Sequence, residues 1–276
     1  MRFEAHGRRF RADVGSPVSI AIPLDFTGAQ PSCFDAPRAE SRPLRAGPFV
    51  GDTRAGGSCN CEILTLAPHC NGTHTECVGH VTEDRVAVSE CVAGGLCLAR
   101  LVTVTPVAAS DSEESSDPAP AHGDRLVTAA ALEAALATRD AQLSALIVRT
   151  LADAPHRAYR GPAPAPYLTR EAAEWLVARG IESLVLDLPS ADRADDGGKL
   201  TAHRIFFGLP PGSRRAADAS RPRASITELA WIGPDIPDGL FLLLEGARVT
   251  AQSMGRDGLG DRLIRMGEAM IAVHDT

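Results

Sequence analysis

Residues 167–192, YLTREAAEWLVARGIESLVLDLPSAD, decide the class of fold that this sequence specifies. Thr169 is a favourable N-cap for a helix, Glu171 is favourable in the first turn, and Gly180 can end the helix. The next segment, IESLVLDLP, predicts a buried strand. Residues 128–150 repeat this order, with TAAALEAALATRD as a helix and SALIVRT as a strand. This alternation predicts an α/β fold with at least partly parallel strands and helices packed on the sheet.

Strands are expected on both sides of these two units, in a chain that we treat as one domain over residues 1–276. The segments whose apolar or β-branched patterns predict strands are 17–24, 61–67, 96–107, 240–250 and 270–276. Residues 27–57 are rich in Pro and Gly and are expected to be mostly loop. Residues 108–123 and 211–224 have no apolar face to bury, so both are expected to be flexible surface insertions.

The composition of the chain limits the kinds of partner that we expect it to bind. The formal net charge is −7 and there is no Lys/Arg-rich run, which argues against a nucleic-acid or anionic-membrane surface. Small molecules or proteins are the expected partners. The most apolar window, Cys91 to Ala109, is broken by Arg100 and Pro106, so it predicts strands and not a membrane span. The first sixteen residues, MRFEAHGRRFRADVGS, lack the apolar region of a secretion signal, and a cytoplasmic location is expected.

Residues 69–80, HCNGTHTECVGH, gather three histidines, two cysteines and a glutamate. The segment directly follows the strand predicted at 61–67, so we expect a loop that leaves a core strand. In an extended segment His74 and Glu76 point the same way, and His80 follows six residues after His74. Imidazole nitrogen and carboxylate oxygen are typical ligands of catalytic zinc or manganese. By composition alone, hydrogen-bonded loop histidines and a solvated glutamate are an alternative interpretation.

The stretch GTHTECVGH resembles the signature of the cyclase family, H-x-G-T-H-x-D-x-P-x-H, which occurs in bacterial kynurenine formamidase and isatin hydrolase. Three departures from the signature are visible: Glu76 stands at the aspartate position, Val78 at the proline position and Cys70 at the first histidine position. The helix-and-strand segments at 126–150 and 167–192 are also similar to the family. His203 in LTAHRIFFG and Glu228 in ITELAWI fall where the family has further ligands. The resemblance covers about residues 15–250.

The resemblance implies a swivelling β/β/α fold and a metal-dependent hydrolase that opens amide, formamide or cyclic amide bonds in small substrates. Carried over by position, it implies one or two divalent ions, zinc or manganese, with His80 as the proton shuttle. The residues implied as ligands are His74, Glu76, His203 and Glu228. Family members are commonly dimers or tetramers, so a homodimer or homotetramer is expected. The alternative is a catalytically reduced relative that uses the fold for binding or scaffolding.

Two positions remain open at this point. Cys70 could bind zinc as a thiolate, but His69 is adjacent to it and a one-residue shift in the loop would let His69 bind instead. Trp231 lies in an apolar stretch three residues after Glu228, where it is either part of the core or a substrate-binding residue. Asp187, Ser190 and Asp192 are candidates to support His203, since metal-bound histidines usually donate their other N–H to an oxygen.

Overall fold

The computed structural model describes residues 1–5, 7–92, 95–136, 143–150, 165–245, 250–251, 263–265 and 269–275. Within these residues the main sheet has ten strands, and its centre is parallel. The parallel strands are β10 (Gly95–Thr103), β13 (Ala145–Arg149), β15 (Ser183–Leu186) and β16 (Ser225–Glu228). The fold class predicted from the sequence, a mixed α/β sheet with packed helices, is therefore confirmed.

Antiparallel strands extend this centre on both sides. Beyond β10 the order is β17 (Gly239–Glu245), β20 (Ala269–Asp275), β2 (Arg8–Ala12) and β1 (Arg2–Ala5), with β3 (Val18–Ser19) also paired to β20. At the opposite edge β9 (His74–Glu76) pairs antiparallel with β16. The short strand that carries the conspicuous histidine and glutamate is thus an edge strand of the main sheet.

Both faces of the central strands are covered, which explains their uninterrupted apolar sequences. In β13 all five residues are buried. Leu146 and Val148 pack into the core beneath the helices, whereas Ala145 and Ile147 pack into a second core on the other face. Because side chains alternate between the faces of a strand, a strand covered on both sides is mainly apolar, and a buried exception such as Arg149 at the end of β13 is hydrogen-bonded.

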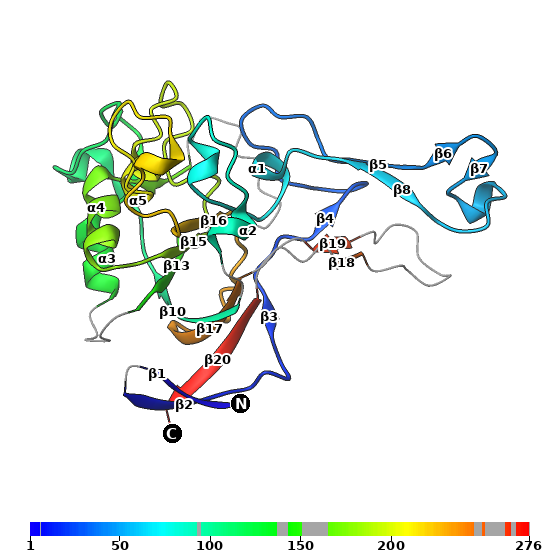
Figure 1. Ribbon diagram of the computed structural model, residues 1–276. Helices are drawn as coiled ribbons and strands as arrows, with labels where there is room; N and C mark the ends of the chain where they lie inside the picture. Colours follow the sequence, from blue (N-terminus) through cyan, green and yellow to red (C-terminus); the bar gives the residue numbers. More distant parts are fainter. Residues whose placement is uncertain are drawn as a thin grey trace.

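Three helices cover one face of the sheet (Figure 1): α3 (Ala129–Ala135), α4 (Arg170–Ala178) and α5 (Thr201–Phe206). The predicted N-caps are confirmed, because the hydroxyl of Thr128 accepts the amide of Ala131 at 3.1 Å and that of Thr169 accepts the amide of Ala172 at 3.0 Å. Gly180 follows α4 with a φ of 73°, a conformation that glycine adopts without strain.

The strand predicted at 61–67 forms, but its expected place in the core is wrong. β8 (Glu62–Thr65) pairs with β5 (Glu40–Pro43) in a two-stranded ribbon. This ribbon continues into β6 (Arg45–Ala46), β7 (Phe49–Val50) and η1 (Thr53–Ala55), and it projects away from the body of the molecule (Figure 1). The expectation that residues 27–57 are mostly loop missed these short strands, because an apolar pattern indicates a strand without indicating its partner.

The strand predicted at 17–24 is divided between two sheets. Its beginning is β3, and its end belongs to β4 (Leu24–Asp25). β4 pairs with β19 (Leu263–Arg265), which in turn pairs with β18 (Thr250–Ala251). Between β3 and β4 the chain forms a single bridge from Ala21 to Ala230. That bridge brings this early segment beside the residues that follow β16.

Residues 108–123 lie at the surface and have defined contacts, and their expected flexibility stays a prediction. They follow β11 (Val107–Ala108) through η3 (Ala109–Asp111), and β11 joins β12 (Arg125–Val127) and β14 (Tyr167–Leu168) in a small sheet. The Glu114 carboxylate accepts hydrogen bonds from the amides of Ala129 and Ala130 and from the hydroxyl of Thr169. A carboxylate is stabilised at helix N-termini, so this acidic segment serves as a cap for α3 and α4.

Residues 211–224 also have defined contacts, and their expected flexibility stays a prediction. They contain η4 (Ala216–Asp218), and the amide of Ala216 donates to the Asp84 carboxylate at 2.8 Å. The Arg221 guanidinium donates to the carbonyls of Phe206 and Ile181. Arginine side chains that bind backbone carbonyls hold the segment against the end of α5, which a composition-based argument does not detect.

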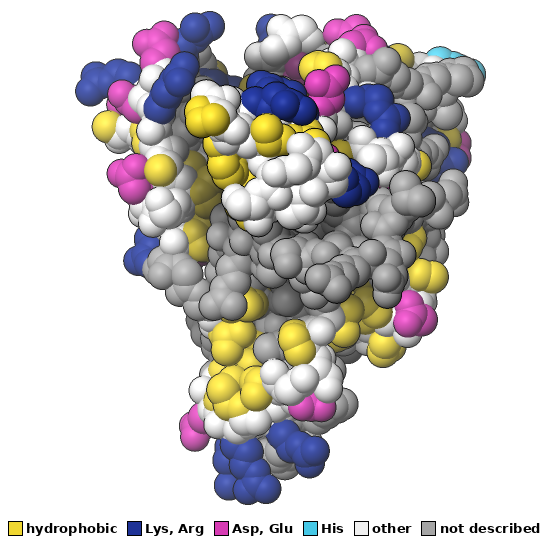
Figure 2. Space-filling view, turned by 90° about the vertical axis from the view of Figure 1, so that its right-hand side faces the viewer, with side chains coloured by type: hydrophobic (Ala, Val, Ile, Leu, Met, Phe, Trp, Pro, Cys, Tyr) yellow, Lys and Arg dark blue, Asp and Glu magenta, His cyan; other side chains and the backbone are white. Residues whose placement is uncertain are grey.

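The surface is mixed in charge, with one local excess of arginine. Figure 2 shows Lys and Arg side chains interspersed with Asp and Glu at its upper edge and gathered at its lower end. The lower end corresponds to β1 and β2, where Arg2, Arg9 and Arg11 are exposed. The expectation of no nucleic-acid partner therefore stays a prediction. Among the described residues, no helix has the length and apolarity needed to cross a membrane.

Candidate metal centre

Two paired strands bring the first three candidate ligands together. In the register of β9 and β16, His74 lies opposite Glu228 and Glu76 lies opposite Ile226. Directly opposite residues share one face of a sheet, and residues two apart on one strand do the same. All three polar side chains therefore share a face, and His74 Nε2 lies 3.4 Å from Glu228 Oε2. The expectation that His74 and Glu76 point the same way is confirmed.

The fourth ligand candidate, His203, comes from α5. Its side chain is buried, and Nε2 lies 2.6 Å from Glu76 Oε1 and 3.4 Å from Glu228 Oε1. His203 thus reaches both carboxylates across a separation of more than a hundred residues from β9. This contact was expected only from the family resemblance, because no local pattern links α5 to β9.

Asp192 fixes the orientation of the His203 ring. His203 Nδ1 donates to Asp192 Oδ2 at 2.6 Å, and the same carboxylate accepts the backbone amides of Ala202 and His203. With Nδ1 engaged in this way, Nε2 is directed at Glu76 and Glu228. Of the three supporting residues considered in the sequence, Asp192 is the one that contacts the ring within the described structure. Asp187 instead accepts from the amide and hydroxyl of Thr150.

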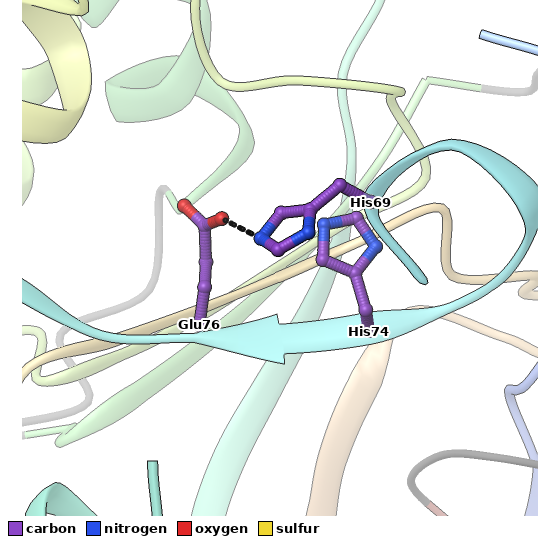
Figure 3. Close-up of side chains that lie close together, drawn as sticks. All are labelled: His69, His74 and Glu76. Atoms are coloured by element: carbon purple, nitrogen blue, oxygen red, sulfur yellow. Dashed lines mark ion pairs between the residues drawn. The ribbon is translucent and has the colours of Figure 1, made fainter. Parts of the chain in front are cut away.

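His69 and His80 approach the same glutamate from two short helical turns, α1 (Pro68–Asn71) and η2 (Val78–His80). His69 Nε2 lies 3.4 Å and His80 Nε2 3.5 Å from Glu76 Oε2. The two imidazole rings stack with centroids 4.5 Å apart. Figure 3 shows the His69 ring beside His74, facing the carboxylate of Glu76, with which it forms an ion pair.

The structure separates the two alternatives that the sequence left open at the first ligand position. His69 joins the cluster, whereas Cys70 packs with Trp231 against the apolar residues Ile22, Cys33 and Leu229. Burial raises the pKa of the Cys70 thiol, which disfavours the thiolate needed for zinc binding. Consecutive residues of a helical turn point about 100° apart, so α1 can direct only one of the two at Glu76.

Trp231 lies beside α1. Its amide donates to the carbonyl of Ile20 at 2.7 Å, and its side chain packs on the apolar cluster that also receives Cys70. This position is close in the chain to Glu228 and close in space to the turn that carries His69. Its role as a substrate-binding residue stays a prediction.

The charges of the cluster are strongly linked. Burial opposes ionisation of Glu76, but the positive charge of His203 outweighs it and holds the pKa of Glu76 well below its usual range. Burial likewise opposes protonation of His203, yet Glu76 and Asp192 outweigh it and raise the pKa of His203 well above its usual value. For Glu228, burial and the charge of Glu76 are outweighed by His203 and His74, so its pKa is lowered.

His74 and His80, two further histidines of the cluster, have pKa values shifted in opposite directions. Burial of His74 is outweighed by its contact with Glu228, and its pKa is raised. For His80, burial is the largest effect, and the pKa is lowered although Glu76 acts in the opposite direction. The lowered pKa favours the neutral imidazole of His80 at neutral pH, which is able to accept a proton.

The donor atoms fit a divalent cation. Within the described part of the chain, His74 Nε2, His203 Nε2 and both carboxylate oxygens of Glu76 are buried without a hydrogen-bond partner, although each lies 2.6 to 3.5 Å from a group of opposite charge. Buried polar atoms without a well-formed hydrogen bond are costly, and so many at one point require an explanation. Two overlapping groups have ligand atoms within 4.8 Å of one another: His69, His74 and Glu76, and Glu76, His80 and His203. Imidazole and carboxylate ligands match zinc and manganese, and the geometry does not choose between them.

Together, a mixed sheet covered by helices and a His/Glu cluster at its edge define an α/β protein with a candidate metal centre. The Cyclase family model matches residues 18–193, more than half of the chain, and the protein belongs to that family. The match includes His69, His74, Glu76 and His80. His203 and Glu228 lie beyond it, and the structure alone brings them to the cluster.

Solved structures agree on the fold. A potential metal-dependent hydrolase with cyclase activity aligns with 12% identity over 95% of this chain and 98% of its own, with a TM-score of 0.51. A predicted metal-dependent hydrolase from Bacillus stearothermophilus aligns with the same identity, coverage and TM-score. An isatin hydrolase bound to the product analogue thioisatinate aligns with 16% identity over 92% and 93%, with a TM-score of 0.49. No curated protein matches the sequence.

Proposed function

We propose that this protein is a metal-dependent hydrolase that opens an amide, formamide or cyclic amide bond in a small substrate by means of a metal-activated water. The observation that carries the proposal is the convergence of buried nitrogen and oxygen donors that have no hydrogen-bond partner within the described residues. Membership of the Cyclase family supports it, as does the likeness in fold to proteins described as metal-dependent hydrolases.

The residues that hold the ion are His69, His74, Glu76, His203 and Glu228, with Glu76 in contact with histidines from three elements. When bound, a divalent ion lowers the pKa of a coordinated water from 15.7 to about 7 and polarises the scissile carbonyl. Glu76 lies at the centre of the donor set, so it can hold one ion or connect two. Zinc and manganese, as one or two ions, both remain within the proposal.

His80 moves the proton. Its side chain is 31% exposed, compared with 4% for His74 and 1% for His203, so a substrate can reach it, as it can the 48% exposed His69. Its lowered pKa leaves Nε2 free to accept a proton from the attacking water at neutral pH. The same atom then delivers that proton to the departing nitrogen, because an amide nitrogen leaves poorly until it is protonated.

Substrate contacts and assembly complete the proposal. Trp231 and the apolar cluster under α1 provide a non-polar wall beside the histidines, suited to the ring of a small aromatic or cyclic amide. As the family resemblance implies, the protein acts as a homodimer or homotetramer. The competing hypothesis of a catalytically reduced relative rested on Cys70 and Glu76. This hypothesis is weakened because His69 takes the ligand position that Cys70 does not fill. In addition, Glu76 contacts the three histidines His69, His80 and His203.

Metal analysis combined with hydrolysis assays tests the proposal. The purified protein is expected to carry stoichiometric zinc or manganese and to hydrolyse an aryl formamide, isatin or a small cyclic imide. His74→Ala and His203→Ala are expected to lose both the ion and the activity. His122→Ala is the matched control, because His122 is an exposed histidine outside the cluster. A metal-free protein that is inert on all three substrate classes contradicts the proposal and supports the scaffold hypothesis.

A further inference from the structure

Thr73 connects three segments that surround the metal centre. Its side chain is 3% exposed, and its hydroxyl accepts the amide of Ile22 at 2.8 Å while donating to the carbonyl of Leu229 at 2.5 Å. A hydroxyl with both a donor and an acceptor partner has one defined orientation. Both residues joined by the second hydrogen bond are next to proposed metal ligands: His74 follows Thr73, and Glu228 precedes Leu229.

Leu229 has an unusual backbone conformation for its type. Its φ is 54°, in the left-handed region that residues with a side chain rarely adopt, and the side chain is buried. A left-handed leucine is strained and persists only where the surroundings hold it. Two hydrogen bonds do so here: the Leu229 amide donates to the carbonyl of Leu188 at 2.8 Å, and its carbonyl accepts from Thr73.

The left-handed residue ends β16 immediately after the ligand. Regular strand pairing stops at the pair Glu228 and His74, and the chain then turns so that Ala230 bonds to Leu186 and bridges to Ala21. Glu228 is thus the last residue of the strand, with its carboxylate 3.4 Å from His74 and bonded to the amide of Ala191 at 2.6 Å. Any change in the Leu229 backbone moves the carboxylate relative to the histidines.

We propose that Thr73 is a positioning residue: its hydroxyl holds Leu229 in the left-handed conformation and thereby fixes the Glu228 carboxylate opposite His74 for metal binding. The inference rests on the proposed function, since it assumes that Glu228 is a ligand. Thr73 itself contacts neither ion nor substrate in this scheme. It acts through the backbone that follows Glu228.

The test is the equilibrium affinity for zinc, measured by competition with a chromophoric chelator on metal-free protein. Thr73→Val keeps the shape but removes both hydrogen bonds, and is expected to weaken zinc binding by about 10- to 100-fold, as loss of a ligand-orienting group does. Thr73→Ser keeps the hydroxyl and is expected to restore the affinity. Thr75→Val is the matched control, because the Thr75 hydroxyl contacts Thr227 and not Leu229.

A second pair of variants tests the backbone directly, whether or not Thr73→Val folds. Leu229→Ile keeps the volume but adds β-branching, which makes a positive φ still more costly. Leu229→Met keeps the volume without branching. Zinc affinity is expected to fall for Leu229→Ile and to stay close to wild type for Leu229→Met.

The outcomes separate this inference from the function on which it rests. If the wild-type protein competes for neither zinc nor manganese, the proposed function itself is contradicted. If the wild type binds zinc and folded Thr73→Val binds equally well, only the positioning role is overturned. The same holds if Thr75→Val loses as much affinity as Thr73→Val, or if Leu229→Ile and Leu229→Met bind zinc equally.

Discussion

The two halves of the candidate metal centre are built differently. His74, Glu76 and Glu228 stand on paired strands and are 7%, 3% and 4% exposed. His69 and His80 stand on single helical turns, with side chains 48% and 31% exposed. A strand pair fixes side chains to within its register, whereas a one-turn segment at the surface adjusts and admits solvent. From this difference we expect the strand half to hold the ion most firmly, with His69 as an adjustable further ligand, and His80 on the turn half to exchange protons.

The largest effect is expected from the buried half. Glu76→Gln keeps the size of the side chain but removes the charge that lies within 3.5 Å of His69, His80 and His203. Stoichiometric metal and hydrolysis are both expected to be lost. Metal content by mass spectrometry and turnover of an aryl formamide check this. Retention of a full equivalent of metal would show that the strand half is not the holding half.

Replacement of His80 is expected to affect catalysis without affecting the ion. His80→Gln should lower kcat by about 10²- to 10⁴-fold, the usual contribution of a general acid–base group, while the metal content stays at the wild-type level. The pH profile sharpens the test. Since the pKa of His80 is lowered, activity should already be on its plateau at neutral pH and should decline only as acid protonates the ring. Loss of the ion in His80→Gln would make it a ligand instead.

A smaller effect on zinc affinity is expected at Asp192, the residue that orients His203. Asp192→Asn keeps the shape of the group that orients His203 but removes its charge. Zinc affinity is expected to fall by about 10- to 100-fold, measured by chelator competition. Asp187→Asn is the comparison variant, since Asp187 bonds to Thr150 and not to His203. Equal losses in both variants would point to general destabilisation.

Metal binding is expected to release protons. The pKa of His203 is raised well above its usual value and that of His74 is raised, so the metal-free cluster holds protons at neutral pH that metal-bound imidazoles cannot keep. Affinity should therefore rise with pH until these groups have titrated. Calorimetry in two buffers with different heats of ionisation measures the protons released, and His203→Ala should release fewer than the wild type.

The smallest effect is expected at Cys70. Cys70→Ser should leave metal content and turnover close to wild type, because this side chain packs on the apolar cluster and not on Glu76. The neighbouring His69→Ala, by contrast, should lose metal affinity. A cobalt-substituted protein adds a spectroscopic check: a thiolate-to-cobalt charge-transfer band would place Cys70 on the ion and reverse the roles of the two residues.

Local patterns predicted the elements well but not their partners. Thr128 and Thr169 cap their helices as expected, and β13 and β15 are buried where continuous apolar sequence predicted them. β8 was correctly expected as a strand, yet its pairing with β5 is a long-range choice that hydrophobic periodicity does not encode. The contacts of the acidic segment at 108–123 were not predicted, because they join residues 15 to 55 positions apart, which no local pattern encodes.

The candidate site was predictable only in part, because local patterns place side chains that are close in sequence and not those that are far apart. The spacing of His74 and Glu76 gave their common face, whereas His203 and Glu228 depended on the family resemblance. Whether His69 or Cys70 points at the cluster depends on the rotation of the single helical turn α1, which the identity of two adjacent residues does not specify. A positioning role for Thr73 could not be predicted from its place in the motif, because the left-handed conformation of Leu229, which it contacts, is known only from the structure.

A crystal structure with anomalous diffraction data at the zinc and manganese edges tests the central claim most directly. The account predicts an anomalous peak within bonding distance of His74, Glu76 and His203, with His69 as a further ligand and Cys70 turned away. Crystals grown with either metal that show no peak among these side chains, or a peak bound by Cys70 elsewhere, would contradict it.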